Sequence, residues 1–211
     1  MSEPPAFSAA FRDELRALFA WRRDVRHFRT DPLPAGALNA LLALADLAPS
    51  VGNAQPWRFV RIVDAELRAR LAAHVDAESE RAACRYDAER AAAYRALKLH
   101  GLREAPELVA VFSEAAPVAG HGLGIATMPE MLRYSTAMAI HTLWLAARAQ
   151  GIGIGWVSIL DPIVVHAMLR VPADWSLIAL LCIGYPEDEH DTPELERRGW
   201  QARDAAPVET R

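Results

Sequence analysis

The chain has few cysteines and no apolar run long enough to cross a membrane. Cys84 and Cys182 are the only two cysteines among its 211 residues, and they form no C-x-x-C pair, so neither a disulfide framework nor a cysteine metal site is expected. The start, from Met1 to Pro5, lacks the basic and then apolar stretches of a signal peptide. These absences predict a cytoplasmic protein with reduced thiols and no membrane span.

The chain also lacks the motifs of several common ligand sites. Its seven histidines are scattered and form no HExxH motif, so no metal site is predicted. No GxGxxG or GxxxxGK[ST] is present, and the net charge of −4 without a continuous basic stripe argues against a nucleic-acid partner. The run Gly151-Ile152-Gly153-Ile154-Gly155 follows a helix and leads into a strand, the reverse of the phosphate-binding order. It is predicted to end the helix and to allow close packing.

Hydrophobic residues are abundant and make up 52% of the chain. They suffice for a single domain over residues 1–211, with a helical start and an extended polar tail from about residue 186 to 211. Predicted helices begin near Ser8, Pro34, Asp64, Tyr86, Pro129 and Asp161, and predicted strands cover 57–63, 107–113, 152–159 and 176–185. Because helices and strands alternate irregularly, the pattern favours an α+β fold. Trp200 stands alone in the polar tail and needs a surface on which to pack, in the same chain or a second subunit.

The first of two informative polar segments is Arg22-Arg23-Asp24-Val25-Arg26. On a helix it would bring three guanidinium groups and one carboxylate within about one turn. Such local positive charge in an acidic chain indicates an anionic ligand, and planar guanidinium groups suit a phosphate. Two simpler interpretations stay open at this point, namely a solvated helix face for the arginines and a salt-bridge role for Asp24.

The second segment is the loop from Ala48 to Trp57. Within it, Ser50 and Gln55 offer donors and acceptors for a planar polar molecule, although a local turn would explain either residue taken singly. Ser158 follows a predicted strand and is either a satisfied core hydroxyl or a donor to a heteroaromatic ring. No G-x-S-x-G surrounds it, which excludes a nucleophile elbow.

These segments resemble the FMN-binding nitroreductase superfamily. The resemblance extends from about Leu15 to Arg203 and rests on separated motifs at residues 22–26, 48–57, 94–101, 104–106, 127–135, 143–149, 155–159 and 193–200. The first motif distinguishes branches, because ordinary members of the superfamily have a serine where this chain has Asp24. The chain is most similar to the branch that consumes its flavin.

The resemblance implies a nitroreductase-like α+β fold with a mixed central sheet flanked by helices. It also implies an intertwined homodimer with FMN at the subunit interface, and a lid to which residues 120–131 contribute. The implied FMN-binding residues are Arg22, Arg23, Val25, Arg26, Ser50, Gln55, Leu99 and Arg203.

The implied reaction is the dioxygen-dependent fragmentation of reduced FMN to 5,6-dimethylbenzimidazole and erythrose 4-phosphate, a step of cobalamin biosynthesis. By the same resemblance, Asp24 is the acid or base near the first ribityl carbon, and Ser158 holds the ring system and assists proton movement. NAD(P)H would act indirectly, through a separate flavin reductase that supplies reduced FMN. Two alternatives stay open: an NAD(P)H-dependent nitroreductase or flavin reductase that keeps its FMN, and a non-catalytic flavin-binding protein.

Overall fold

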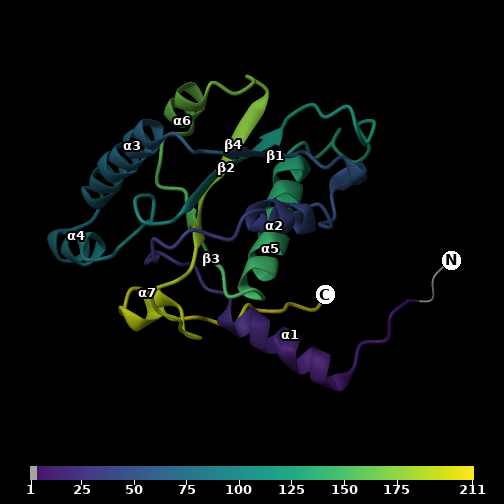
Figure 1. Ribbon diagram of the computed structural model, residues 1–211, viewed down its shortest axis with the longest axis horizontal. Helices are drawn as coiled ribbons and strands as arrows, with labels where there is room; N and C mark the ends of the chain where they lie inside the picture. The colour runs from purple at the N-terminus through teal and green to yellow at the C-terminus, as the bar shows by residue number, and fades with distance from the viewer. Residues whose placement is uncertain (1–3) are drawn as a thin grey trace.

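The computed structural model describes residues 4–211 (Figure 1). Residues 1–3, which belong to the segment without signal-peptide features, lie outside this range. The helices are α1 (Ala9–Trp21), α2 (Ala37–Ala45), α3 (Ala65–Ala83), α4 (Ala88–Arg95), α5 (Met131–Arg148), α6 (Pro162–Leu169) and α7 (Glu194–Arg197), with a 3₁₀ turn η1 (Val51–Asn53). The strands are β1 (Trp57–Arg61), β2 (Glu107–Glu114), β3 (Gly153–Val157) and β4 (Trp175–Gly184).

The four strands form one sheet in the order β1-β2-β4-β3. Every neighbouring pair is antiparallel, so the α+β fold class is confirmed while the sheet differs in one respect from the expected mixed one. Among residues 4–211, the parallel pairing is confined to an isolated bridge between Asp24 and Ile154. The segment around Asp24 runs beside β3 too briefly to count as a fifth strand.

Helices cover both faces of the sheet (Figure 1). Residues of β2 alternate between the two faces, as expected for a strand buried on both sides. Leu108 and Phe112 pack with residues of α3 and α6, whereas Val109 and Val111 pack with residues of α2 and α5. The result is one hydrophobic core on each face of a shared sheet.

Some predicted helix boundaries are confirmed and others move. The Ser8 hydroxyl caps α1 by accepting a hydrogen bond from the Phe11 amide at 3.1 Å, as predicted. The helix expected from Tyr86 to Leu102 is shorter, because α4 ends at Arg95. The chain beyond it leaves the helix to pack on the core: a Cβ placed on Gly101 would lie 2.3 Å from the Phe28 ring.

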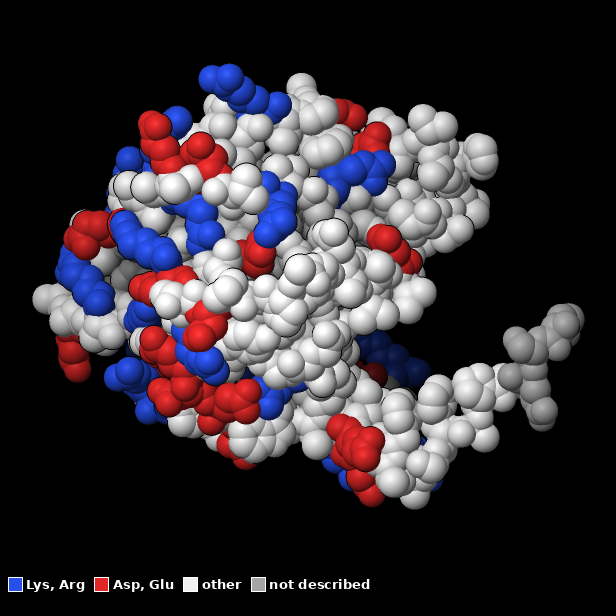
Figure 2. Space-filling view, in the orientation of Figure 1, with Lys and Arg blue, Asp and Glu red and all other residues white. Residues whose placement is uncertain are grey.

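Within residues 4–211, no helix combines the length and the apolar character that a membrane span requires. Charged side chains are unevenly distributed over the surface. Figure 2 shows basic and acidic residues interspersed over α3, α4 and α7, whereas the area around α2 carries few of them.

Candidate functional site

Residues 22–26 form an extended segment along the outer edge of β3. Helix α1 ends at Trp21, and Arg22 has extended backbone angles of φ −72° and ψ 109°. The Val25 amide then donates a hydrogen bond to the Ile154 carbonyl at 3.0 Å. The helical turn predicted for residues 22–26 is therefore wrong, because the backbone of this segment pairs with β3.

The extended conformation still gathers the charged groups, by a different periodicity. Alternate residues of an extended chain share a side, which places Asp24 and Arg26 together, and Arg23 reaches the same hollow as this pair. The Arg26 Nε donates to the Asp24 Oδ2 at 2.9 Å, in agreement with this arrangement. The predicted cluster of charged side chains therefore exists, but the two-residue repeat of an extended chain forms it in place of a helical turn.

Two glycines of β3 allow the segment to approach so closely. A Cβ on Gly155 would lie 2.1 Å from the carbonyl oxygen of Val25, and a Cβ on Gly153 would lie 2.7 Å from a methyl group of the same residue. Gly151, just after α5, has a φ of +70° that favours glycine. The predicted roles of this glycine run, helix termination and close packing, are confirmed.

The Asp24 carboxylate is held at both oxygens. Its Oδ1 accepts a hydrogen bond from the Trp156 amide at 2.8 Å, and its Oδ2 is paired with Arg26, whose side chain is 12% exposed. Burial raises the pKa of Asp24, although the Trp156 amide and the Arg26 charge oppose that shift. Asp24 is thus an oriented carboxyl group for which the protonated form is less costly than usual.

The Arg22 and Arg23 guanidinium groups are not neutralised by carboxylates. Arg22 lies over the Trp144 ring at 4.7 Å, and the Arg23 Nε donates to the Asp191 carbonyl at 2.8 Å. Within the described range of 4–211, neither has an acidic side chain at salt-bridge distance. Burial is the main cause of a lowered pKa for both, and the charge of Arg203 lowers it further. An anion would relieve this crowding of like charges.

A small hollow of about 150 Å³ opens beside these residues. It is lined by Arg23, Asp24 and Arg26, by Arg197 and Arg198 of the tail, and by the acidic residues Asp188 and Glu194. Residues of the polar tail therefore line the same hollow as Asp24 and Arg26.

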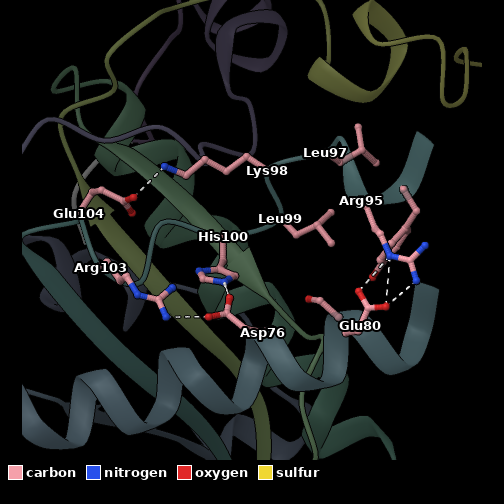
Figure 3. Close-up of a pocket in the computed structure, with 11 residues that line it drawn as sticks. Asp76, Glu80, Arg95, Leu97, Lys98, Leu99, His100, Arg103 and Glu104 are labelled. Atoms are coloured by element: carbon pink, nitrogen blue, oxygen red, sulfur yellow. Dashed lines mark hydrogen bonds and ion pairs between the residues drawn. The ribbon is translucent and has the colours of Figure 1, made fainter. Parts of the chain in front are cut away.

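Leu99 lines a larger hollow of about 490 Å³, within the usual size range of small-molecule pockets (Figure 3). The Arg26 Nη1 donates to the Lys98 carbonyl at 3.4 Å. This bond joins the hollow to the arginines of residues 22–26, called the arginine group below. Several polar pairs surround it: Lys98–Glu104 at 2.9 Å, Arg103–Asp76 at 2.6 Å, His100–Asp76 at 2.8 Å and Arg95–Glu80 at 2.5 Å.

The Ser50 loop is a separate structure near the start of α5. The Ser50 hydroxyl accepts a hydrogen bond from the Gln55 amide at 3.0 Å, so the local-turn interpretation describes that hydroxyl correctly. The expected lid segment packs on this loop, since a Cβ on Gly120 would lie 2.8 Å from the Gly52 carbonyl. Gln55 itself has a φ of +40°, and the turn leaves its side chain half-buried.

Helix α5 separates the Ser50 loop from the arginine group in one chain. The Ser135 hydroxyl accepts a hydrogen bond from the Val51 amide at 3.0 Å, and the Trp144 indole donates to the Arg23 carbonyl at 3.3 Å. These two anchors are nine residues apart on α5, which corresponds to about 14 Å along the helix. A single chain thus places the two groups at different ends of α5.

Ser158 is exposed and lies one residue beyond the end of β3. It follows Trp156, whose amide binds Asp24, by two residues, or about 7 Å along an extended chain. Both predicted catalytic residues therefore belong to the same edge of the sheet.

The sequence did not indicate four partners of the predicted residues within the described range. These are the Trp144 indole, the Trp156 amide, the Lys98 carbonyl and the Asp191 carbonyl. Three of them are backbone groups, which carry no residue-type signal. Nothing in the spacing of Trp144 indicated that its ring would support an arginine.

Comparisons with known proteins agree on one family. The family model described as "Nitroreductase family" matches residues 19–185 of this chain. The 5,6-dimethylbenzimidazole synthase of Rhodospirillum rubrum is 58% identical over 99% of this chain and 99% of its own. A protein of the same name from Rhodobacter capsulatus is 52% identical over 92% of this chain and 94% of its own. Among solved structures, oxidized iodotyrosine deiodinase bound to FMN and 3-iodo-L-tyrosine has a TM-score of 0.72 and 25% identity, over 93% of this chain and 97% of its own.

Proposed function

Since the chain belongs to the nitroreductase family, we propose that it is a 5,6-dimethylbenzimidazole synthase. In the proposed reaction, reduced FMN and dioxygen give 5,6-dimethylbenzimidazole and erythrose 4-phosphate for cobalamin biosynthesis, and the pyrimidine ring of the flavin leaves as a separate oxidised fragment. The observation that carries the proposal is the 58% identity over almost the full length of a relative with that name. The placement of Asp24 against Arg26 supports it, as do Arg22 and Arg23, which have no acidic side chain at salt-bridge distance within residues 4–211.

The arginine group fits the phosphate of FMN. Arg22 and Arg23 are partly buried, and burial lowers the pKa of both; there a phosphate dianion is stabilised by charge-assisted hydrogen bonds, to which the exposed Arg203 would add its charge. Val25 and Arg26 would complete this end, and Leu99 would line the flavin on the side of the larger hollow. Bound reduced FMN would supply both the carbon atoms of the product and the electrons for dioxygen.

The protein's chemical contribution is proton transfer and positioning. Asp24 is the proposed acid or base, since its carboxyl is fixed by the Trp156 amide and Arg26 while burial raises its pKa. Ser158 is proposed to hold the ring system through its hydroxyl and to assist proton movement. A closed site would also keep water away from the reacting atoms.

Reduced FMN is proposed to come from a separate, NAD(P)H-dependent flavin reductase in the cytoplasm. Dioxygen would be the second substrate. In this scheme NAD(P)H never needs to enter the site, and the synthase itself consumes one flavin in each turnover.

A homodimer is part of the proposal, and the uncovered apolar surface supports it. Helix α1 has no buried residue, and Leu47 is 76% exposed next to α2, in the area that carries few charges in Figure 2. Tyr134 and Met138, one turn apart on α5, are also exposed. Burial against a second copy would remove this surface from water.

A two-fold dimer would also complete the site. If the α5 helices of two chains pack antiparallel, the start of one lies beside the end of the other. The Ser50 loop of one chain, with Gln55, would then face Arg22 and Arg23 of its partner. The flavin would lie between the two chains, as the resemblance implies.

A single-turnover assay tests the proposed function. FMN is reduced without oxygen, bound to the protein and mixed with air, and the products are identified by mass spectrometry. The expected result is one 5,6-dimethylbenzimidazole and one erythrose 4-phosphate for each flavin lost. Recovery of unchanged FMN would contradict the proposal and favour a flavin-binding protein. Sustained NAD(P)H oxidation with the flavin spectrum intact would instead indicate a nitroreductase or flavin reductase.

A further inference from the structure

Trp200, the lone aromatic residue of the polar tail, packs on α4. Its ring lies 5.7 Å from that of Tyr86 at 85° and 5.9 Å from that of Tyr94. The Arg90 guanidinium lies 4.2 Å from the indole centroid, and its Nη2 donates to the Trp200 carbonyl at 3.5 Å. Edge-to-face and cation–π contacts of this kind stabilise the packing beyond the effect of the area they bury. The tail is therefore fixed at this residue.

The chain beyond Trp200 has little else to hold it. Residues 201–211 are exposed and have no regular secondary structure. Arg203 follows Trp200 by three residues, a span of at most about 11 Å, and Figure 1 shows the tail running from α7 past the end of α1. Before Trp200, the Asp191 carbonyl already accepts a hydrogen bond from Arg23. The next attachment before Arg203 is a long backbone hydrogen bond from the Gln201 amide to the Leu195 carbonyl at 3.4 Å, so the indole is the last aromatic anchor of the tail before Arg203.

We propose that Trp200 is a positioning residue for the phosphate end of the flavin site. By locking residue 200 onto α4, it restricts the following residues so that Arg203 stands beside Arg22 and Arg23. The tail already reaches Arg23 at the Asp191 carbonyl, and the charge of Arg203 is among the causes that lower the pKa of Arg22 and Arg23. The inference rests on the proposed function, because it assigns the arginine group to the phosphate of FMN.

A purely structural role for Trp200 makes a different prediction. Tyr94 belongs to α4 and lines the same hollow as Leu99. If the indole merely held α4 in place, its loss would disturb the wall next to the flavin ring. Binding of flavins with and without a phosphate would then weaken equally.

The test compares oxidised FMN with riboflavin, which lacks the phosphate, by fluorescence titration of the full chain. Trp200→Ala and Arg203→Ala are each expected to weaken FMN binding by about tenfold, the effect of one charge-assisted hydrogen bond, and to leave riboflavin binding within about twofold. The double variant is expected to bind FMN no more weakly than Arg203→Ala alone. Trp200→Phe should restore most of the affinity, and Val208→Ala, at a residue 92% exposed in the same tail, serves as the control.

Each other outcome overturns the inference. Equal loss of FMN and riboflavin in Trp200→Ala would assign the indole to α4, and additive losses in the double variant would show that the two residues act independently. An unchanged FMN affinity in Trp200→Ala, with a loss in Arg203→Ala, would remove the positioning role alone. Product formation from reduced FMN by the unaltered protein is measured in parallel, so failure of the proposed function is seen separately.

Discussion

Asp24 is the single residue on which the proposed chemistry depends. Asp24→Asn keeps an oxygen that can accept the Trp156 amide hydrogen bond but removes the ionisable group. We expect it to bind FMN within about threefold of the unaltered protein and to form product at least about 100-fold more slowly, the usual size of an acid–base contribution. Single-turnover mass spectrometry measures the rate. Asp31→Asn, at an exposed surface pair, should change neither quantity. A normal rate in Asp24→Asn would refute the assignment.

The raised pKa of Asp24 gives a prediction about pH. Since folding raises this pKa, its contribution to the free energy of unfolding is full below the ordinary aspartate pKa of about 3.9 and is lost as the pH rises through the folded value. Infrared difference spectra should therefore show a protonated carboxyl that persists above pH about 4 and is missing in Asp24→Asn. If the difference signal vanishes within the ordinary aspartate range, burial does not control this group.

At the scale of elements, the docking of residues 22–26 on β3 depends on one glycine more than on another. A Cβ at Gly155 would lie 2.1 Å from the Val25 carbonyl oxygen, which is backbone, whereas a Cβ at Gly153 would meet the Val25 side chain, at 2.7 Å from a methyl group and 3.1 Å from its Cβ. We expect Gly155→Ala to lower the free energy of unfolding by about 3 kcal/mol and to weaken FMN binding, and Gly153→Ala to cost about 1 kcal/mol. Urea unfolding and FMN titration of both variants measure this. Similar losses in the two would contradict the docking geometry.

The sequence predicted correctly those features that depend on residues close together in the chain. The Ser8 cap and the helix-ending Gly151 depend on near neighbours, and both are as expected. The conformation of residues 22–26 depends on β3, because Asp24 bonds to Trp156, which lies 132 residues further along the chain. The helical spacing assumed for this segment was therefore wrong. The arginine cluster was nevertheless recognised, because residue type and local charge do not depend on whether the chain is helical or extended there.

At the scale of the whole molecule, we propose that residues 1–211 form one domain. Both hydrophobic cores pack on the same two central strands, β2 and β4. Loss of these strands would therefore disrupt both cores together. Four predicted roles in the flavin site stay predictions, because the partners of these residues would lie on the flavin or on a second chain. They are the roles of Ser50, Gln55, Leu99 and Ser158. Residue patterns alone do not specify which chain supplies which half of a shared site.

Mixed dimers can decide that question. Arg22→Ala removes a guanidinium from the phosphate end, and Gln55→Ala removes an amide from the Ser50 loop. If each site takes its arginines from one chain and its loop from the other, a dimer of the two variants has one site with both defects and one with none. Co-expressed with different tags and purified through both, it should bind about one FMN per dimer with unaltered affinity, while each variant's own dimer binds weakly. If both halves came from the same chain, every site would carry a defect and no tight binding would return. The separation of the two groups along α5 favours the first result.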